Sequence, residues 1–294
     1  LKELVVGMNE SRKIIKTFKP DIVIGTGGYV SGPIVLLGSL MGKKTLIHEQ
    51  NAYPGITNKI LGRFVDMIAV TFEEAIKYFK KKDKIIVTGN PIRSEIYNID
   101  KTEAYKKLDL DPSKKVILSF GGSGGQLKLN DAILDLFVSE NLDNIQWLHI
   151  TGKRLYDDFN KKLERYENKI SANIKILPYL YEMPEAMNIA DIIIASSGAI
   201  TLAEISAIGA ASILVPKSYT AENHQEYNAR AFEKAKASVV ILEKELNKDN
   251  LKTNIDNILY NDKVLKEMKT NSKKMGNTKA TSLIVDKVFD LIGK

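Results

Sequence analysis

Residues 192–204 read Ile-Ile-Ile-Ala-Ser-Ser-Gly-Ala-Ile-Thr-Leu-Ala-Glu, an apolar run that passes through small residues into a helical pattern. The apolar run predicts a buried strand, and the serines and glycine predict the beginning of a helix. Backbone N–H groups at a helix beginning lack intrahelical partners and can bind an anion. Glu204 lies six residues after Gly198. A phosphate-binding turn followed by a carboxylate suggests a nucleotide, with its diphosphate on the helix end and its ribose hydroxyls on Glu204.

Short apolar strands alternate with helical patterns along the rest of the chain, for example at residues 33–41 and 73–79. Continuous apolar strands separated by helices predict parallel sheets that are covered on both faces. The fold class is therefore α/β, with two Rossmann-like, doubly wound domains. The predicted strands are residues 21–25, 45–48, 67–70 and 85–88 in the first part, and residues 116–120, 146–150, 174–177, 192–195, 212–215 and 238–242 in the second.

The length of 294 residues favours two domains. A boundary is predicted near Gly89-Asn90-Pro91, because a polar, charged segment follows at residues 98–115. We therefore expect an N-terminal domain at residues 1–92 and a C-terminal domain at 93–278. The last helix, within residues 279–294, is expected to pack back on the first domain. The chain begins Leu-Lys-Glu without an initiator methionine, so we expect a piece whose N-terminal part is absent.

Composition excludes several classes of protein. With 44% hydrophobic and 27% charged residues, the chain is typical of a folded globular protein. No apolar run reaches the ~18 residues of a membrane span, and no secretory signal pattern occurs. The sequence holds no cysteine and three histidines, His48, His149 and His224. Disulfides and thiolate metal sites are thereby excluded, and a histidine-rich metal centre is disfavoured.

The net charge of +7 is concentrated in the first domain. Residues 1–92 contain 14 Lys and Arg against 8 Asp and Glu, a net charge of +6, whereas residues 93–294 contain 29 against 28, a net charge of +1. A basic half suggests an anionic partner, either nucleic acid or an anionic lipid surface. A basic surface that is simply solvated is the alternative. No interleaving of aromatic and basic residues supports nucleic-acid binding.

Two glycine-rich segments follow predicted strands, at residues 24–33 and 120–126. Glycine permits a positive φ angle and a close approach of the backbone to a ligand. The alternative is a tight turn without a ligand. The second segment lacks the Lys-Ser/Thr ending of a P-loop, which disfavours ATPase chemistry.

Three polar clusters also follow predicted strands. His48-Glu49-Gln50-Asn51 offers two proton acceptors, although the cluster could instead only position its loop. Arg93 could pair with a phosphate or lie on the surface beside a rigid turn. Residues 223–228 carry amides and a carboxylate that suit sugar hydroxyls, or merely begin a helix. No Gly-x-Ser-x-Gly elbow occurs, so a nucleophilic triad is unsupported.

Six of these blocks, taken in order, resemble the MurG-type N-acetylglucosaminyltransferases of bacterial peptidoglycan synthesis. The resemblance implies a glycosyltransferase fold of the B type, in which two domains face a cleft and the first domain here is incomplete. It implies inverting transfer of GlcNAc from UDP-GlcNAc to the C4 hydroxyl of lipid I, which gives lipid II, without a metal ion or a cofactor. The blocks are IGTGGYVSGP (24–33), LIHEQNAYPGITNK (46–59), VTGNPIR (87–93), FGGSGGQLKLN (120–130), SSGAITLAE (196–204) and NHQEYNAR (223–230).

The resemblance also implies a location and partners. The C-terminal domain is expected to hold UDP-GlcNAc. The N-terminal domain is expected to hold the undecaprenyl-linked acceptor and to lie peripherally on the anionic, cytoplasmic face of the membrane. Nucleic acid is not an expected partner.

Residue roles follow where the blocks match. Glu204 is expected to hold the ribose hydroxyls, Leu180 to pair with uracil through its backbone, and Ser123 to contact the donor. Gln225 and Glu226 are expected to read GlcNAc hydroxyls. The catalytic base candidates are His48 and Glu49. The diphosphate is expected at Ala199, Ile200, Thr201, Leu202 and Ala203, with Asn51 and Arg93 facing the donor from across the cleft.

The chain departs from the family pattern at three places. Gly124 stands where the family often has Gln, and Ser196 where it often has Arg. The family's first glycine loop, GGTGGH, does not occur, and its histidine is a candidate base. We therefore expect the chain to bind its donor but to turn over poorly. A UDP-GlcNAc 2-epimerase-like enzyme and a non-catalytic sugar-nucleotide-binding protein are the alternatives.

Overall fold

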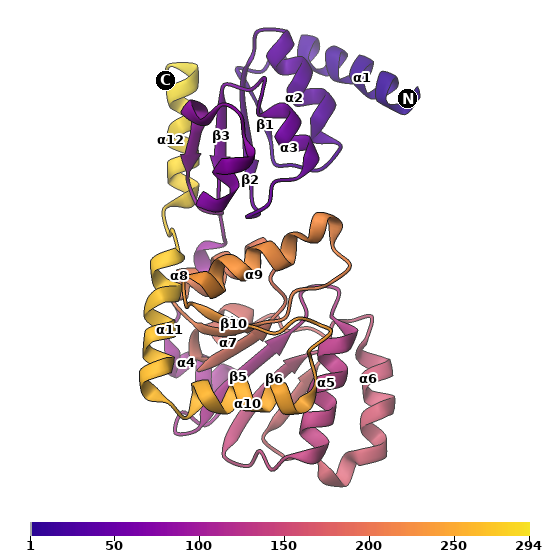
Figure 1. Ribbon diagram of the computed structural model, residues 1–294, viewed down its shortest axis with the longest axis vertical. Helices are drawn as coiled ribbons and strands as arrows, with labels where there is room; N and C mark the ends of the chain where they lie inside the picture. The colour runs from indigo at the N-terminus through magenta and orange to yellow at the C-terminus, as the bar shows by residue number, and fades with distance from the viewer. Residues whose placement is uncertain (1) are drawn as a thin grey trace. The chain divides into compact units, whose positions relative to one another are not determined.

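The computed structural model describes residues 2–294, and it divides into two compact units (Figure 1). The N-terminal unit comprises the chain up to Ile92 together with Asn277–Lys294, and the C-terminal unit comprises Arg93–Gly276. Each unit is built on one parallel sheet with its own hydrophobic core. The last helix, α12 (Ala280–Ile292), thus belongs to the N-terminal unit.

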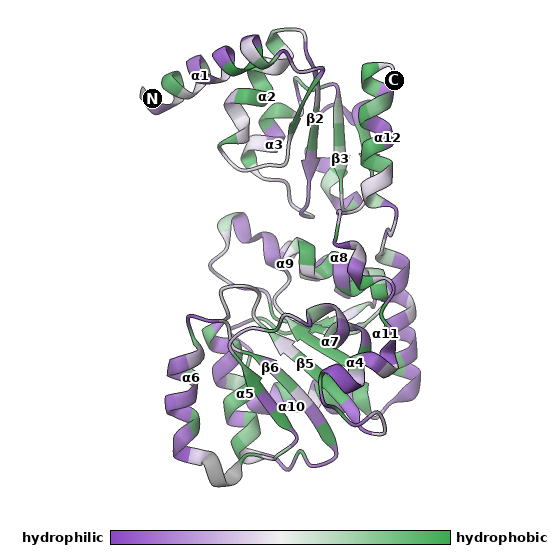
Figure 2. Cartoon of the chain, turned by 180° about the vertical axis from the view of Figure 1, so that it is seen from behind, coloured by the Kyte–Doolittle hydropathy of each residue, from purple (hydrophilic) through white to green (hydrophobic). Residues whose placement is uncertain are grey.

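The strands of the N-terminal unit pair in parallel in the order β1-β2-β3-β4. Figures 1 and 2 show α2 and α3 on one side of this sheet and α12 on the other. Val35, Ile47 and Ile68 are completely buried between the sheet and the helices. The elements are α1 (Lys2–Phe18), β1 (Ile22–Gly25), α2 (Ser31–Leu40), β2 (Lys44–Glu49), α3 (Ile56–Leu61), β3 (Met67–Val70), the 3-10 helices Glu73–Tyr78 and Lys82–Lys84, and β4 (Ile85–Val87).

The six strands of the C-terminal unit pair in parallel in the order β10-β9-β8-β5-β6-β7. The chain begins in the middle of the sheet at β5, moves outward to β7, and returns to the other side of β5 at β8. The loops after β5 and β8 therefore leave the sheet at a topological switch point, where open α/β sheets bind ligands. The strands are β5 (Lys115–Phe120), β6 (Ile145–Ile150), β7 (Ile174–Leu177), β8 (Ile192–Ala195), β9 (Ala211–Leu214) and β10 (Ser238–Val240).

Helices cover both faces of this sheet, and their polar sides point outward (Figure 2). A core cluster joins α5 and α10 to the sheet around Trp147 and Phe137, whose rings meet edge to face at 5.1 Å. The helices are α4 (Lys101–Lys107), α5 (Leu127–Ser139), α6 (Tyr156–Leu163), α7 (Met183–Ile189), α8 (Ala199–Ile208), α9 (His224–Lys234), α10 (Lys248–Leu259) and α11 (Asp262–Met275), with 3-10 helices at Ser94–Ile96, Glu164–Lys169 and Ala221–Asn223.

The predicted α/β fold class is confirmed, and each of the predicted strands occurs within two residues of its expected bounds. The helical pattern expected at residues 73–79 is a 3-10 helix, Glu73–Tyr78. Its hydrogen bonds join residues three apart, as in a 3-10 helix: Ala75 N–H donates to Phe72 O at 3.1 Å, and Phe79 N–H donates to Ile76 O at 3.2 Å.

A buried histidine makes the stability of the C-terminal unit depend on pH. The indole N–H of Trp147 donates to Ser119 Oγ at 2.7 Å, and the Ser119 hydroxyl in turn lies 2.8 Å from His149 Nδ1. Burial lowers the pKa of His149 to about 3, against the opposing effect of the Ser119 contact. Because the unfolded chain takes up this proton near pH 6.5, stability is lost as the pH falls below 6.5. At pH 5 the loss from this residue is about 2 kcal/mol.

This linkage can be measured with the single tryptophan, Trp147, which reports on the C-terminal unit. Urea unfolding followed by its fluorescence is expected to show a smaller loss of stability from pH 7 to pH 5 in His149→Asn than in the wild type. Other titrating groups are shared by the two proteins and cancel in the difference. Equal pH dependence in both proteins would contradict the assignment.

Candidate functional site

Two loops rich in glycine and serine leave adjacent strands of the C-terminal unit at the switch point. Phe120 at the end of β5 is in register with Ala195 at the end of β8. The glycine loop at residues 121–126 and the turn at residues 196–198 therefore begin side by side. The backbone N–H of Ser196 donates to Phe120 O at 3.4 Å, which joins the two loops directly.

Helix α8 presents its N-terminus at this place. Its N-cap, Gly198, is extended, with ψ 143°, and makes no side-chain cap hydrogen bond. By helix geometry the N–H groups of Ala199, Ile200 and Thr201 have no intrahelical partner. The N–H of Leu202 does have one, because it donates to Gly198 O at 3.0 Å. Together with the N–H of Gly198, these three groups are the backbone donors that the beginning of α8 can offer to an anion.

Ala203 and Glu204 lie beyond that first turn. Ala203 is within the helix, and Glu204 is buried with 7% exposure. Arg93 Nε donates to Glu204 Oε1 at 2.8 Å, while half of the arginine side chain remains exposed. Burial raises the pKa of Glu204, and the charge and hydrogen bond of Arg93 oppose this shift. The pair keeps a carboxylate and a guanidinium together at the side of α8.

The glycine loop is shaped by positions that exclude a side chain. Gly125 has φ +72°, and a Cβ there would lie 2.2 Å from Thr151 O. Its N–H donates to Gly122 O at 2.9 Å, which closes a turn with the exposed Ser123 at its tip. Gly122 has φ +77°, and its Cβ position would lie 3.3 Å from Ser196 Oγ. At Gly122 the backbone of the loop thus lies close to Ser196, in the turn that precedes α8.

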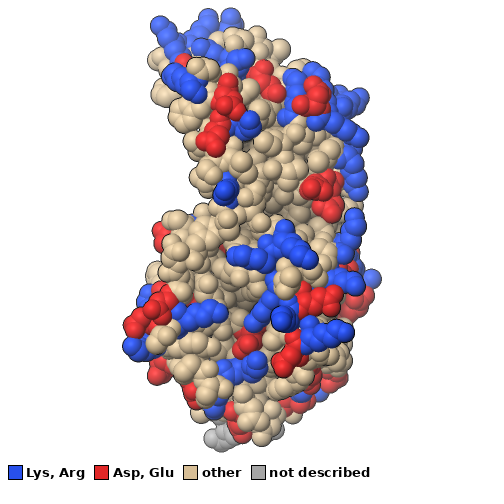
Figure 3. Space-filling model, turned by 90° about the vertical axis from the view of Figure 1, so that its left-hand side faces the viewer, with Lys and Arg blue, Asp and Glu red and all other residues tan. Residues whose placement is uncertain are grey.

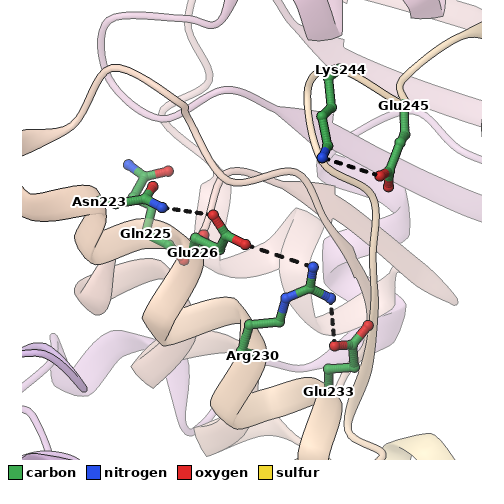
Figure 4. Close-up of polar contacts among 8 residues, drawn as sticks. Asn223, Gln225, Glu226, Arg230, Glu233, Lys244 and Glu245 are labelled. Carbon is green, nitrogen blue, oxygen red and sulfur yellow. Dashed lines mark hydrogen bonds and ion pairs between the residues drawn. The ribbon is translucent and has the colours of Figure 1, made fainter.

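The start of α9 carries the two residues expected to read a sugar. Both oxygens of Gln225 accept hydrogen bonds that hold the residue in place. Its Oε1 accepts from Lys217 N–H at 3.0 Å, and its backbone oxygen accepts from Ser197 Oγ at 2.7 Å. Glu226 lies between Asn223, which donates to it at 2.6 Å, and Arg230 at 3.7 Å (Figure 4). Gln225 is therefore tied to the α8 turn, and Glu226 is held within its own helix.

Leu180 lies in the loop between β7 and α7, where its side chain is buried with 6% exposure. Tyr179 and Tyr181 flank it, with ring centroids 4.9 Å apart and both rings exposed. A hollow of about 440 Å³ adjoins this loop. It is lined by Arg93, Glu95, Ile99, Tyr181, Pro184 and Glu185. The role of Leu180 toward uracil remains a prediction.

Four residues at this site were not found from the sequence: Lys217, Arg154, Gln126 and Glu243. Lys217 Nζ donates to Gly125 O at 2.8 Å, and Arg154 Nη2 lies 3.2 Å from the Cβ position of Gly124. Gln126 donates to Glu243 Oε1 at 2.8 Å. No local pattern marks these side chains, because they come from loops that follow different strands.

In the N-terminal unit, both ring nitrogens of His48 have partners. Nε2 lies 3.0 Å from Gly89 O, to which it donates, and Nδ1 accepts from the Gln50 amide at 3.1 Å. Burial lowers the pKa of His48, against the Gly89 hydrogen bond and the charge of Glu49. The neutral ring therefore links β2 to the loop after β4, and its acceptor nitrogen is occupied.

Glu49 is also occupied, and it organises the loop after β2. Its side chain is 2% exposed and accepts four hydrogen bonds. Oε1 accepts from the backbone and side-chain N–H groups of Asn51 at 2.9 and 3.2 Å. Oε2 accepts from Asn58 Nδ2 at 2.8 Å and from Gly55 N–H at 3.2 Å. The geometry of both base candidates thus favours the alternative in which this cluster positions its loop.

Models of known families match both parts of the chain. The glycosyltransferase family 28 N-terminal domain matches residues 1–70, and the glycosyltransferase family 28 C-terminal domain matches residues 116–284. The second match includes the glycine loop, the α8 turn and the start of α9.

Curated relatives are similar over nearly the whole chain. A Finegoldia magna protein named UDP-N-acetylglucosamine--N-acetylmuramyl-(pentapeptide) pyrophosphoryl-undecaprenol N-acetylglucosamine transferase is 50% identical over 99% of this chain and 79% of its own length. A Thermoanaerobacter protein of the same name is 48% identical over 98% of this chain and 78% of its own length.

Solved structures share the fold. The crystal structure of Acinetobacter baumannii MurG matches with a TM-score of 0.80 and 26% identity, over 98% of this chain and 80% of that one. A Neisseria meningitidis UDP-GlcNAc 2-epimerase bound to UDP-GlcNAc matches with a TM-score of 0.73 and 15% identity, over 98% and 80% of the two chains. The second likeness shows the fold alone. The domain models and the relatives agree, and the chain belongs to the MurG family of glycosyltransferases.

Proposed function

We propose that this protein transfers GlcNAc from UDP-GlcNAc to the C4 hydroxyl of lipid I, forming lipid II with inversion at the sugar, in peptidoglycan synthesis. The names of its relatives support the donor and a lipid-linked acceptor. The observation that supports binding of the donor is the arrangement at the switch point of the C-terminal unit. There the α8 N-terminus, the glycine loop and the Arg93–Glu204 pair lie on adjacent elements.

The residues of this site suit the binding and departure of UDP. The N–H groups of Ala199, Ile200 and Thr201 point to where a diphosphate would carry its charge, and Arg93 adds a cation. Donors that are already in place stabilise the charge that develops on the leaving UDP. Glu204 is proposed to accept hydrogen bonds from the ribose hydroxyls, and Gln225 and Glu226 to bind the sugar.

We do not assign the proton acceptor for the C4 hydroxyl to His48 or Glu49. A general base needs an acceptor atom that can reach the substrate proton. The Nδ1 atom of His48 and both oxygens of Glu49 already accept hydrogen bonds from the protein. We propose that these two residues hold the loop that carries Asn51.

We also propose that the N-terminal unit binds an anionic membrane surface. Ile56, Ile60 and Phe64 recur every four residues along and just beyond α3, with exposures of 63%, 49% and 43%. Lys59 and Arg63 lie among them in the sequence. Figure 3 shows groups of Lys and Arg side chains on one face of this unit, with Asp and Glu side chains and uncharged surface between them. Apolar side chains beside cations suit the boundary between headgroups and acyl chains.

Within residues 2–294, none of the helices combines the length and the apolar character that crossing a bilayer requires. Binding at the surface is tested by sedimentation with vesicles. We expect the protein to sediment with vesicles that contain anionic lipid, and an Ile60→Glu, Phe64→Glu variant to lose most of this binding. Equal sedimentation of the variant, or equal binding to neutral vesicles, would contradict the proposal.

The proposed reaction is tested by incubating the protein with radiolabelled UDP-GlcNAc and lipid I and following label into lipid II. Release of N-acetylmannosamine from UDP-GlcNAc without an acceptor would instead identify an epimerase. UDP binding without either product, also in a chain extended to the length of its relatives, would indicate a non-catalytic sugar-nucleotide-binding protein. For the 294-residue chain alone we expect UDP binding and slow turnover, because its sequence holds no GGTGGH loop.

A further inference from the structure

Lys217 places an ammonium group beside the backbone of the glycine loop. It follows β9, and its Nζ donates to Gly125 O at 2.8 Å. The same Nζ lies 4.0 Å from the position that a Cβ of Gly122 would occupy, and Ser196 Oγ lies 3.3 Å from that position. The lysine ammonium and the serine hydroxyl therefore border one space above Gly122, next to the beginning of α8.

Among the side chains of the described residues, no carboxylate lies within 4.0 Å of Lys217 Nζ, so the ammonium has no ion-pair partner in this part of the chain. Glu243 is near enough to affect it, but its oxygens accept from Gln126 Nε2 at 2.8 Å, from Ser218 N–H at 3.1 Å and from the Ser218 hydroxyl. Lys217 Nζ donates to the neutral Gly125 carbonyl, and it lies 5.9 Å from the ring centroid of Tyr219, which is also uncharged.

The surroundings of Lys217 favour an anion beside it. Burial lowers the pKa of Lys217, the charge of Glu243 opposes this shift, and the charge of Arg154 adds to it. Two cations thus approach one glycine loop, since Arg154 Nη2 lies 3.2 Å from the Cβ position of Gly124. Two positive charges that are partly removed from water repel each other, and an anion bound between them offsets this repulsion. Backbone turns of this kind also bind anions through their N–H groups.

The backbone of Lys217 is fixed relative to the rest of the site. Its N–H donates to Gln225 Oε1 at 3.0 Å, and the Gln225 backbone oxygen accepts from Ser197 Oγ at 2.7 Å. Lys217 is therefore tied through Gln225 to the turn that begins α8. A charge held in this way needs little reorganisation when a ligand arrives.

We infer that Lys217 binds the diphosphate of the nucleotide donor. Its ammonium would contact the diphosphate from the side of the glycine loop, opposite the backbone N–H groups at the beginning of α8. This inference rests on the proposed function, because it takes a nucleoside diphosphate as the ligand. It adds a side chain that determines preference for the diphosphate over the nucleoside. The neutral Ser196 beside it contributes a hydroxyl but no charge.

The test compares UDP with uridine in titration calorimetry on the whole chain. Lys217→Gln keeps an N–H donor for Gly125 O but removes the charge, and Lys217→Arg keeps the charge. For Lys217→Gln we expect UDP binding to weaken about 10- to 100-fold and uridine binding to stay unchanged. Lys217→Arg is expected to recover most of the UDP affinity. Lys106→Gln, which removes a cation paired with Glu103 on α4 at 2.7 Å, is the matched control and is expected to bind UDP as the wild type does.

The outcomes separate this inference from the function on which it rests. If wild-type protein binds neither UDP nor UDP-GlcNAc, the proposed function fails. If the wild type binds UDP and Lys217→Gln binds it equally well, only the role of Lys217 fails. An equal loss of UDP and uridine affinity in Lys217→Gln would show that the residue merely shapes the loop. Trp147 fluorescence during thermal unfolding confirms that each variant has a folded C-terminal unit, and Lys217→Arg supplies the comparison if Lys217→Gln does not fold.

Discussion

Replacing Glu204 with alanine is expected to weaken UDP binding by about 1–3 kcal/mol, the scale of hydrogen bonds lost from a charged group. Glu204 is buried, and Arg93 holds one of its oxygens at 2.8 Å. The substitution removes the proposed acceptor of the ribose hydroxyls and also leaves the Arg93 guanidinium without its carboxylate. Both effects act on the nucleotide, since the ribose and the diphosphate are neighbouring parts of one ligand.

The ribose role is isolated by comparing UDP with 2′-deoxyuridine diphosphate in calorimetry. The wild type is expected to prefer UDP, and Glu204→Ala is expected to bind the two nucleotides nearly equally. Asp256→Ala is the matched control, because it removes a carboxylate from an ion pair with Lys252 on α10 of the same unit. Unchanged UDP affinity in Glu204→Ala, or a preference for UDP that survives the substitution, would refute the ribose assignment.

Replacing Glu49 with alanine is expected to destabilise the N-terminal unit by about 3 kcal/mol or more. The side chain is 2% exposed and accepts four N–H groups, from Asn51, Gly55 and Asn58. Removing the carboxylate leaves these buried donors without their acceptor, at about 1–3 kcal/mol for each group that finds no substitute. Hydrogen exchange of the amides at residues 50–58 reports this effect directly, and exchange is expected to accelerate.

The same residue distinguishes a structural role from a catalytic one. In Glu49→Gln the shape is kept, but an amide N–H₂ replaces one accepting oxygen, so an intermediate loss of stability is expected. Glu73→Ala, which removes an exposed carboxylate from the same unit, is the control and is expected to leave exchange unchanged. If Glu49→Gln abolished transfer while stability and exchange stayed at wild-type values, Glu49 would be the base after all.

Much of the fold could be predicted from local pattern. The mostly apolar runs at residues 116–120 and 192–195 are strands in the structure, because runs of four or five such residues between glycine-rich or polar segments can be buried on both faces of a parallel sheet. The glycine loop and the α8 turn were also predictable, since both follow strand ends. The helix at residues 73–79 was less predictable, because hydrophobic periodicity over two turns does not distinguish an α-helix from a 3-10 helix.

The partners of the site residues were much harder to predict. Arg93 and Glu204 are 111 positions apart in the sequence, and their ion pair depends on how the loop before α4 passes the side of α8. His48 and Glu49 have the residue types of proton acceptors, yet their acceptor atoms already accept hydrogen bonds from nearby N–H groups of the protein. Residue type alone does not reveal whether a lone pair is already occupied.

The sequence by itself determined the α/β class, the strands and the two loops of the donor site, because each depends on the order of apolar, small and polar residues over about ten positions. Only the tertiary structure decided that Lys217 faces the glycine loop. Its ammonium reaches Gly125 O, 92 positions away, because the strand order places β5 and β9 on either side of β8. Contacts of this kind arise from the order of strands in the sheet, and no periodicity along the chain records that order.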